Sequence, residues 1–293
     1  MNDVVAPERE IPLNLFRHGA PLMVRVLENR RLTPLDSAND VHHVTVQFPA
    51  GAFAFLEGQS VGFAPPGLNA RGRPHVPRLY SIACDREGED GSGTTLAVCV
   101  KRVQFQTETG DAGHGLASNM LCDARPGDEL PMTGPAGREF VLPEEPGGQY
   151  LLLATGTGVA PFRAFAQRRA KWPGAQRGKM WLFFGVQTHG DALYADEWPV
   201  ATDADFRLTY AFSREDKTAD GRRMYVQDRM REAGQELLAF VRAPRTQVFV
   251  CGIKGMEAGI DEAFTALARD AGLEWRVLRE ELRVAGRWHV EVY

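Results

Sequence analysis

Short segments in which apolar and polar residues alternate run through the first half of the chain. They lie at 23–27, 43–48, 79–83, 96–100 and 128–133, and turn residues such as glycine and proline separate them. A period of two is typical of strands that bury one face. The pattern therefore predicts an antiparallel sandwich or barrel within residues 21–145.

Apolar segments and helical segments alternate in the second half. The apolar ones lie at 150–154, 180–184, 206–212 and 247–250, and the first helical one covers about 161–171. Strands that alternate with helices predict a parallel sheet with helices on both faces. The turn-rich stretch 143–149 separates the two patterns. We therefore expect an α/β domain over 146–293, and an arm of residues 1–20 before the first domain.

One connection in the first half is unusually polar. Residues 85–95 are rich in glycine and in acidic side chains. This composition predicts an exposed hairpin loop, and we assign no chemistry to it.

The charge balance argues against nucleic acid as a partner. The chain of 293 residues carries 34 Lys and Arg against 38 Asp and Glu, a formal net charge of −4 at pH 7. Proteins that hold polyanions usually present a basic field. We therefore expect no nucleic-acid binding.

The cysteines argue against the common metal sites. Cys84, Cys99, Cys122 and Cys251 are far apart in the sequence and form no C-x-x-C pair. Zinc sites and iron–sulfur clusters need closely spaced ligands. We expect no metal, so any electron chemistry must use a bound organic cofactor.

The start of the chain does not look like a targeting segment. Acidic residues and prolines occur in residues 1–20, where a signal peptide has a basic start and an apolar run. No apolar stretch is long enough to span a membrane. We expect a cytoplasmic protein with reduced thiols.

A glycine-rich turn follows the first apolar segment of the second half. Its sequence is TGTGVAPF at 155–162, between a predicted strand and a predicted helix. Glycines at such a turn let a diphosphate approach the backbone N–H groups of the helix start. The third glycine of the dinucleotide fingerprint is replaced by Pro161, which suits a first helical turn. Alone, the turn is equally compatible with a connection that binds no ligand.

Four further sequence blocks accompany this turn. They are RLYS at 78–81, GLASN at 115–119, CGIKGM at 251–256 and WHVEVY at 288–293. Together with the turn, and in this order, they resemble the plant-type ferredoxin–NADP⁺ reductase family from about residue 23 to residue 293. The resemblance implies two domains: an antiparallel β-barrel that binds FAD, followed by a Rossmann-like α/β domain that binds NADP.

The resemblance implies that the first two blocks bind FAD. Arg78 would pair with the diphosphate, Tyr80 would stack on one face of the isoalloxazine, and Ser81 would hydrogen-bond near the flavin nitrogen that takes up hydride. Guanidinium groups match phosphate oxygens, and a tyrosine ring loses little entropy on stacking. The other residues implied here are Gly115, Leu116, Ala117 and Ser118 at the diphosphate, and Cys99, Lys101 and Phe105 near the adenylate and the mouth of the site. Ala117 replaces a cysteine, and Phe105 a tyrosine, that the family usually carries.

The other blocks are implied to bind NADP(H). Thr157 and Gly158 would hold its diphosphate, and Cys251 would lie against the nicotinamide. The other residues implied here are Gly252 and Met256 from the same block as Cys251, and Ser213, Arg214, Arg223, Tyr225 and Gln227 around the 2′-phosphate. Hydroxyl and guanidinium groups can hold a dianion that NAD lacks. The alternative for the arginines is that they are solvated loop charges.

The chain ends on an aromatic residue. By resemblance, the ring of Tyr293 covers the flavin face on which the nicotinamide must lie, so it has to move aside for hydride transfer. Glu291 would hydrogen-bond near Ser81. The expected catalytic residues are therefore Ser81, Cys251, Glu291 and Tyr293.

These implications define the expected function. We expect a flavoenzyme that transfers electrons between NADP(H) and a one-electron carrier, ferredoxin or flavodoxin, with FAD as the converter. A basic stretch of Arg71, Arg73, His75 and Arg78 could attract an acidic carrier. Two alternatives stay open: the reductase component of an oxygenase system, and a flavin-binding or nucleotide-binding sensor that does not turn over.

Overall fold

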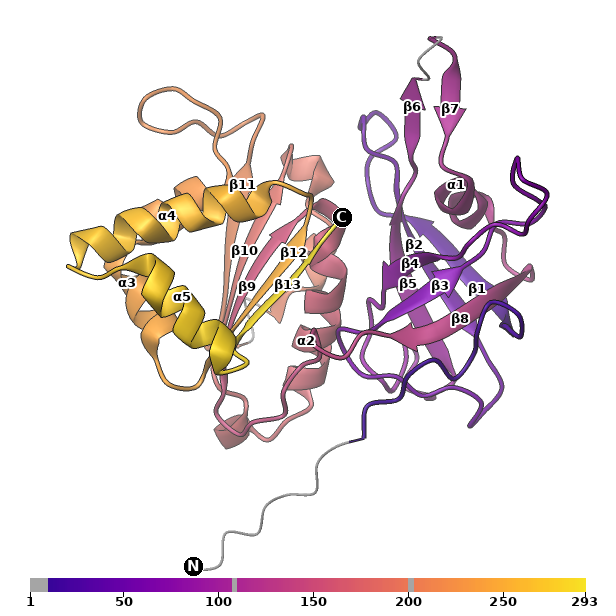
Figure 1. Ribbon diagram of the computed structural model, residues 1–293, viewed down its shortest axis with the longest axis horizontal. Helices are drawn as coiled ribbons and strands as arrows, with labels where there is room; N and C mark the ends of the chain where they lie inside the picture. The colour runs from indigo at the N-terminus through magenta and orange to yellow at the C-terminus, as the bar shows by residue number, and fades with distance from the viewer. Residues whose placement is uncertain (1–9, 107–109, 200–202) are drawn as a thin grey trace, which may run out of the picture.

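The computed structural model describes residues 10–106, 110–199 and 203–293. Figure 1 shows two halves side by side, each built around its own sheet. The first sheet has the order β4-β3-β8-β1-β2-β5, and all its neighbouring pairs are antiparallel. Its strands are β1 (Leu22–Arg31), β2 (Val41–Gln47), β3 (Ser60–Phe63), β4 (Arg78–Ser81), β5 (Thr95–Lys101) and β8 (Glu129–Ala136).

The first sheet closes into a barrel. A bridge between Ile82 and Val98 joins the end of β4 to β5, the two outer strands of the sheet. β1 alternates as the sequence predicts, because Val24 and Val26 are buried while Arg25 points to solvent. The helix α1 (Leu116–Asp123) and a small ribbon of β6 (Gln104–Gln106) and β7 (Ala112–His114) follow β5.

The second sheet is wholly parallel, with the order β11-β10-β9-β12-β13. Its strands are β9 (Gln149–Thr155), β10 (Met180–Val186), β11 (Phe206–Phe212), β12 (Thr246–Gly252) and β13 (Trp288–Val292). The order reverses between β9 and β12, and open α/β sheets bind ligands beyond the strand ends at such a point. The carboxyl ends of β9 and β12 are therefore where a nucleotide is expected.

Helices cover both faces of the parallel sheet. The helix α2 (Ala160–Ala170) stands between this sheet and the barrel, while α3 (Val226–Arg242), α4 (Met256–Asp270) and α5 (Trp275–Val284) cover the far face (Figure 1). Side chains of β9 alternate between the two layers. Leu151 and Leu153 belong to the core under α3 and α4, whereas Leu152 belongs to the core shared with α2. Both faces are buried, which explains why β9 reads as a continuous apolar run.

The two halves share one aromatic core. Phe140, from the segment that joins the sheets, lies 5.1 Å from Phe249 of β12 between ring centroids. Phe162 and Phe165 of α2 complete the cluster, and all four rings are buried. The apolar contact holds α2 against both sheets.

The predicted architecture is confirmed, with differences in detail. Each predicted strand and the first helix occur, but β3, β6 and β7 were not predicted, because strands of three or four residues are too short to show an alternation. The expectation of an exposed loop at 85–95 is wrong at both ends of the loop, since Asp85 and Thr95 are each 1% exposed. The structure passes from β8 to β9 between Ala136 and Gln149, and the boundary at 145/146 stays a prediction.

The described part of the expected arm lies against the barrel. The N–H of Asn14 donates to the Pro135 carbonyl at 2.8 Å, and Phe16 bridges Gly134. Residues 1–9 lie outside the described part of the chain. Within the ranges described, no helix is long and apolar enough to cross a membrane. No group of three or more potential metal-binding side chains occurs in these ranges either.

Candidate active site between the two halves

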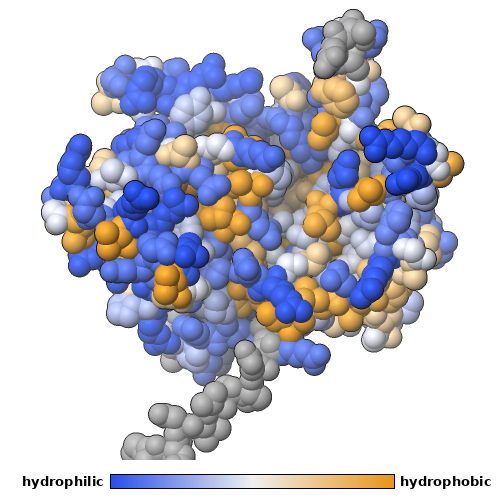
Figure 2. All heavy atoms as spheres, in the orientation of Figure 1, coloured by the Kyte–Doolittle hydropathy of each residue, from blue (hydrophilic) through white to orange (hydrophobic). Residues whose placement is uncertain are grey.

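A cleft of about 1110 Å³ opens where the barrel meets the parallel sheet. Figure 2 shows this face of the molecule hollowed between the two halves. Four elements contribute to its walls: β4, the start of α1, the turn η1 (Gly156–Val159) after β9, and the end of β13. The expected residues that line it are Arg78, Tyr80, Ser81, Cys99, Lys101, Gly115, Leu116, Ala117, Ser118, Thr157, Glu291 and Tyr293.

The strand β4 places a cation, a ring and a hydroxyl in the cleft. Arg78 is exposed, and its guanidinium forms no ion pair with any side chain of the described ranges. Tyr80 is half-buried with its ring centroid 6.3 Å from that of Phe63. Burial raises the pKa of Tyr80 to about 12, so the phenol stays neutral. The strand therefore offers an unpaired cation for an anion and a neutral flat ring for stacking.

The helix α1 begins at Gly115 without a side-chain cap. A Cβ at Gly115 would lie 2.7 Å from Ser118 Oγ and 2.8 Å from Val103 Cβ, so only glycine fits there. Ser118 Oγ donates to the Gly115 carbonyl and accepts from the Val103 N–H. The serine hydroxyl is thus used within the chain, and the first backbone N–H groups of the helix remain for an anion.

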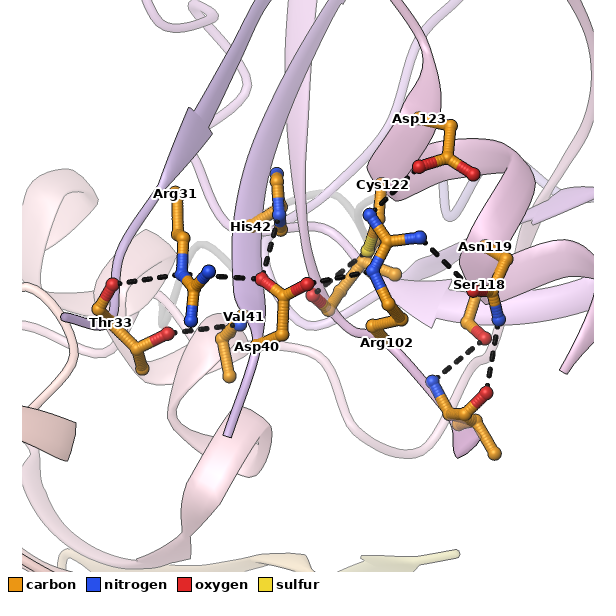
Figure 3. Close-up of polar contacts among 12 residues, drawn as sticks. Arg31, Thr33, Asp40, Val41, His42, Arg102, Ser118, Asn119, Cys122 and Asp123 are labelled. Atoms are coloured by element: carbon orange, nitrogen blue, oxygen red, sulfur yellow. Dashed lines mark hydrogen bonds and ion pairs between the residues drawn. The ribbon is translucent and has the colours of Figure 1, made fainter. Parts of the chain in front are cut away.

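A polar network of side chains from the barrel holds α1 in place (Figure 3). Arg102 donates to Asn119 Oδ1 at 3.0 Å and pairs with Asp123 at 2.9 Å, both on α1. Its Nε also pairs with Asp40 Oδ2 at 2.7 Å, and His42 Nε2 lies 2.9 Å from the other oxygen of Asp40. Although burial acts to raise the pKa of Asp40, the Arg102 hydrogen bond and the nearby charges hold it below its usual range. The ionised carboxylate therefore fixes the guanidinium that holds the helix.

Asn29 of β1 supports the other end of the same helix. Its Nδ2 lies 3.1 Å from the carbonyl oxygens of Leu121 and Cys122 and 2.7 Å from that of Ala124. These are among the last carbonyls of α1, which have no partner within the helix. The side chain of Asn29 is oriented in turn by His42 Nδ1, 2.7 Å from its Oδ1.

A second hollow of about 440 Å³ lies beyond the carboxyl ends of the parallel strands. It shares Lys101 and Thr157 with the cleft, so the two spaces join. The expected residues that line it are Ser213, Arg214, Arg223, Tyr225, Gln227 and Met256. The resemblance implied five of these residues, all but Met256, as one group, and the structure brings them together.

Backbone contact fixes the turn η1 at this junction. A Cβ at Gly158 would lie 2.2 Å from the Cys251 carbonyl oxygen, and one at Gly252 would lie 2.1 Å from Thr155 Oγ1. Both positions therefore require glycine. The expected residues Gly158 and Gly252 allow β12 and η1 to approach closely, and the N–H of Ile253 donates to Thr155 Oγ1 at 3.0 Å.

The last residue of the chain is held in place at the junction. The Tyr293 hydroxyl lies 2.7 Å from Thr157 Oγ1, its N–H donates to the Gly252 carbonyl, and its own carbonyl accepts from Lys254. As a whole residue, Tyr293 is 57% exposed. It is therefore ordered but lies at the surface of the cleft.

Two titratable groups lie on adjacent strands beside Tyr293. Cys251 and Glu291 are partners in the pairing of β12 with β13. Burial raises the pKa of Cys251, and the charge of Glu291 adds to this effect, so the thiol stays neutral. Burial also raises the pKa of Glu291 to about 7, which lets this carboxyl exchange a proton near neutral pH.

Comparison with known proteins identifies the family. Residues 152–262 match the family described as "Oxidoreductase NAD-binding domain". The ferredoxin–NADP reductase of Synechocystis sp. is 43% identical over 290 residues, which cover 97% of this chain and 70% of that protein. The ferredoxin–NADP reductase of Picosynechococcus sp. is 42% identical over 294 residues, covering 98% and 73%. The chain belongs to the ferredoxin–NADP reductase family.

The fold agrees with the family assignment. Ferredoxin–NADP⁺ reductase from Plasmodium falciparum, solved with 2′P-AMP, superposes with a TM-score of 0.75 at 23% identity. The match covers 96% of this chain and 99% of that one. The family and the two-domain fold implied by the sequence resemblance are therefore confirmed.

Not every expected ferredoxin–NADP reductase residue lines the site. Cys251 is 1% exposed and lines neither the cleft nor the second hollow. Phe105 lies on β6, 53% exposed, with its ring against Gly113, and it is not among the lining residues. In the basic stretch, His75 and Arg78 line the cleft, whereas Arg71 and Arg73 are exposed beside it in sequence and do not. The roles of these residues stay predictions.

The sequence reasoning missed several residues of the cleft wall. The lining side chains that it did not name for the site include Pro65, Val76, Leu79, His114, Ile253 and Glu257. Leu79 of β4 and Val76 just before it are 63% and 66% exposed, so two apolar side chains lie close together at the surface. Outward-facing apolar positions beside the RLYS block were the signal that could have indicated a cleft wall.

Proposed function

We propose that this chain transfers electrons between NADP(H) and ferredoxin through bound FAD. FAD, when bound, supplies a ring that accepts a hydride and passes single electrons on. The observation that carries the proposal is the junction of the two hollows at Lys101 and Thr157, under the Tyr293 ring. A flavin in the larger hollow and a nicotinamide nucleotide in the smaller one would meet at this point.

The cleft residues fit FAD in chemistry. The free guanidinium of Arg78 and the uncapped start of α1 supply donors for a diphosphate. The glycine required at position 115 keeps the approach to that helix open. We propose that Tyr80 stacks on the inner face of the ring and that Ser81 donates a hydrogen bond at its reacting edge. Lys101, 2.6 Å from Asn39 Oδ1, stands at the mouth and can reach a phosphate of either cofactor.

The second hollow fits NADP(H) rather than NAD(H). Ser213, Arg214 and Arg223 bring one hydroxyl and two guanidinium groups to the same space. The related Plasmodium enzyme was solved with 2′P-AMP, which carries the phosphate that distinguishes the two nucleotides. We propose that these three residues bind the 2′-phosphate and that Tyr225, 44% exposed, stacks on the adenine.

The hydrogen bond between Tyr293 and Thr157 lets the last residue cover the junction and also occupy the Thr157 hydroxyl until a nucleotide binds. With the bond in place, the ring covers the junction. When a nicotinamide enters, the bond breaks and the Thr157 hydroxyl becomes free for the nucleotide. Entry therefore costs binding free energy, which the 2′-phosphate contacts supply. We propose that Cys251 packs against the nicotinamide as a neutral thiol and that Glu291 exchanges the proton.

The test compares donors and acceptors. The purified protein is expected to carry FAD, to oxidise NADPH much faster than NADH, and to reduce ferredoxin. Absorbance of the flavin, identification of the extracted cofactor and a panel of acceptors measure this. Transfer of electrons to a cytochrome or a Rieske protein, but not to ferredoxin, would support the reductase component of an oxygenase system instead. A bound flavin whose absorbance NADPH does not bleach would support a sensor.

Two finer points belong to the same proposal. Flavodoxin is a second candidate carrier, and Arg71 and Arg73 are candidates for contact with an acidic partner. Docking at Arg71 and Arg73 would be refuted if the rate of carrier reduction depended neither on salt nor on charge reversal at these two residues.

We also propose a cytoplasmic location, which agrees with four cysteines that are all free and buried.

A further inference from the structure

The acidic loop between β4 and β5 faces the basic side of α2. The sequence alternates Asp85, Glu87 and Glu89, while α2 and the turn after it carry Arg163, Arg168 and Lys171. Their ion pairs cross from the barrel to the parallel half: Lys171 with Asp85 at 2.6 Å, Lys171 with Glu87 at 2.8 Å, Arg168 with Glu87 at 3.3 Å and Arg163 with Glu89 at 2.5 Å.

One of these pairs is buried and has several partners. The Arg163 side chain is 9% exposed, and it donates to the Ala83 carbonyl at 2.8 Å and to Glu197 at 2.6 Å in addition to Glu89. Its guanidinium also lies 4.8 Å from the centroid of the Tyr194 ring. By contrast, Arg168 pairs with carboxylates that are 32% and 49% exposed. Exposed pairs contribute little to stability, whereas removal of one partner from a buried pair is costly.

The carboxylate of Glu89 joins the same cluster to the barrel. His43 of β2 lies 2.8 Å from Glu89 through Nε2 and 3.1 Å from the Tyr194 hydroxyl through Nδ1. Although burial acts to raise the pKa of Glu89, His43 and Arg163 lower it to about 2, so it is ionised. Tyr194 itself has a left-handed backbone, with φ at 58°, although it is not glycine. The cluster therefore includes a buried tyrosine whose backbone conformation is rare for that residue.

The turn η1 runs directly into α2 and packs on β12 of the same half. The turn η1 ends at Val159, and α2 begins at the next residue. Thr157 of η1 contacts Tyr293, and Gly158 packs on the Cys251 carbonyl. Movement of α2 relative to the barrel would therefore carry the proposed nicotinamide site away from β4 and the proposed flavin site.

We infer that Glu89 and Arg163 are positioning residues, whose buried pair holds the nucleotide turn η1 at its working distance from the flavin side of the cleft. The inference rests on the proposed function. Neither residue lines the cleft or the second hollow, so neither touches a cofactor. They act through α2 and the loop, on the geometry between the halves.

The main test uses Arg163→Met, with Arg168→Met on the same helix as the matched control. Because a displacement of about 1 Å can slow a reaction about 100-fold, we expect Arg163→Met to slow NADPH-dependent flavin reduction between about 10-fold and 100-fold. The affinity for 2′-phospho-AMP should stay near the wild-type value, because that probe binds the second hollow alone. FAD content should also stay near wild type, and Arg168→Met should resemble wild type throughout.

Hydrogen exchange provides a readout that does not depend on activity. Amides of η1 and of the first turn of α2 should exchange faster in FAD-loaded Arg163→Met, while those of β12 stay protected. Glu89→Gln and Arg163→Lys change the side chains less and are expected to give smaller effects of the same sign. They carry the test if Arg163→Met does not fold.

The outcomes separate this inference from the proposed function. A wild-type protein that NADPH does not reduce would refute the proposed function, and the exchange data would still decide whether the pair holds η1. Wild-type rates and exchange in all three variants would overturn the inference. It would also be overturned if the rate fell only in proportion to lost FAD or lost 2′-phospho-AMP affinity, or if Arg168→Met had the same effect.

Discussion

Two helix starts face the cleft, and the chain supports them by different means. α1 is held by polar side chains, with Arg102 on one side and Asn29 at the end. The turn η1 before α2 is held by backbone contact, since Gly158 lets it approach the Cys251 carbonyl at a distance no Cβ would tolerate. Both starts are expected to hold diphosphates. Charged side chains order α1 itself, whereas the inferred Glu89–Arg163 pair acts only on the distance of η1 from the barrel.

The two kinds of support determine which substitutions the start of α1 and the turn η1 will tolerate. A hydrogen-bonded support fails when one partner is removed, because the remaining charged groups stay partly buried without compensation. A close-packed support fails when volume is added, because neighbouring backbone has no room to move. Substitutions of opposite kinds should therefore damage the two sites, and each should leave the other site intact.

Gly158→Ala should give the largest effect. The added methyl would lie 2.2 Å from the Cys251 carbonyl oxygen, so η1 or β12 must move. With an overpacking cost of about 3 kcal/mol, we expect NADPH-dependent flavin reduction to slow about 100-fold. Stopped-flow absorbance measures the rate, and FAD content should be unchanged. Gly174→Ala, where a methyl meets nothing within 4 Å, is the control; a near wild-type rate in Gly158→Ala would mean that η1 does not need this contact.

Arg102→Met should damage the other site. The change leaves Asp40 and Asp123 without the guanidinium that joins them, and α1 loses its link to Asn119. With a loss of about 2 kcal/mol, FAD should bind about 30-fold more weakly, while 2′-phospho-AMP binding stays unchanged. Fluorescence of released flavin measures the first quantity, and titration calorimetry the second. Arg269→Met, at an 80% exposed side chain on α4, serves as control. Equal weakening of both ligands would contradict the separation of the two supports.

The sequence predicted the close-packed site better than the hydrogen-bonded one. Glycines 156 and 158 and Cys251 lie in short local motifs, and such motifs name the turn and the strand end directly. The partners of Arg102 come from a loop before β2 and from α1, so no spacing in the sequence joins them. Contacts between distant segments are set by the tertiary fold, which the alternation pattern alone does not determine.

The acidic loop shows the same limit more plainly. Its composition predicted an exposed hairpin, because glycine and acidic residues usually face solvent. The structure instead pairs Glu89 with Arg163, which is 74 positions away and was expected only as part of a helix. The basic side of α2 supplies the counter-charges. Charge alternation on one segment and basic residues on a distant helix were visible, but their pairing was not.

Replacement of Ser213 and Arg214 by alanine tests whether recognition of the 2′-phosphate in the second half also depends on polar groups. Both residues line the second hollow, but Arg214 is exposed and its contacts are screened by water. We therefore expect the preference for NADPH over NADH, as a ratio of kcat/KM, to fall only about 10-fold. Steady-state kinetics with both donors measure it. The rate with NADH should hardly change, and an unchanged ratio would remove these residues from the 2′-phosphate site.

Glu291→Gln should give the smallest effect, at the point where the two halves meet. Burial raises the pKa of Glu291 to about 7 from the ordinary 4.5, so the folded protein holds a proton there that the unfolded chain releases. The contribution of this group to stability is therefore present below about pH 4.5 and is lost as the pH rises through about 7. A neutral carboxyl also repels the negative charge of a reduced cofactor less than a carboxylate does. Oxidation of NADPH should therefore slow a few-fold as the pH rises through about 7.

The glutamine variant cannot lose a proton, and it should therefore flatten both profiles. Melting temperatures and flavin-reduction rates measured between about pH 5 and 9 would reveal this. Ser81 and Cys251 stay in place in the variant, so a change confined to the pH profile assigns the proton to position 291 rather than to the neighbouring hydroxyl or thiol. If the inflection near pH 7 survives in Glu291→Gln, the titrating group lies elsewhere, and the junction of the halves positions the cofactors without supplying the proton.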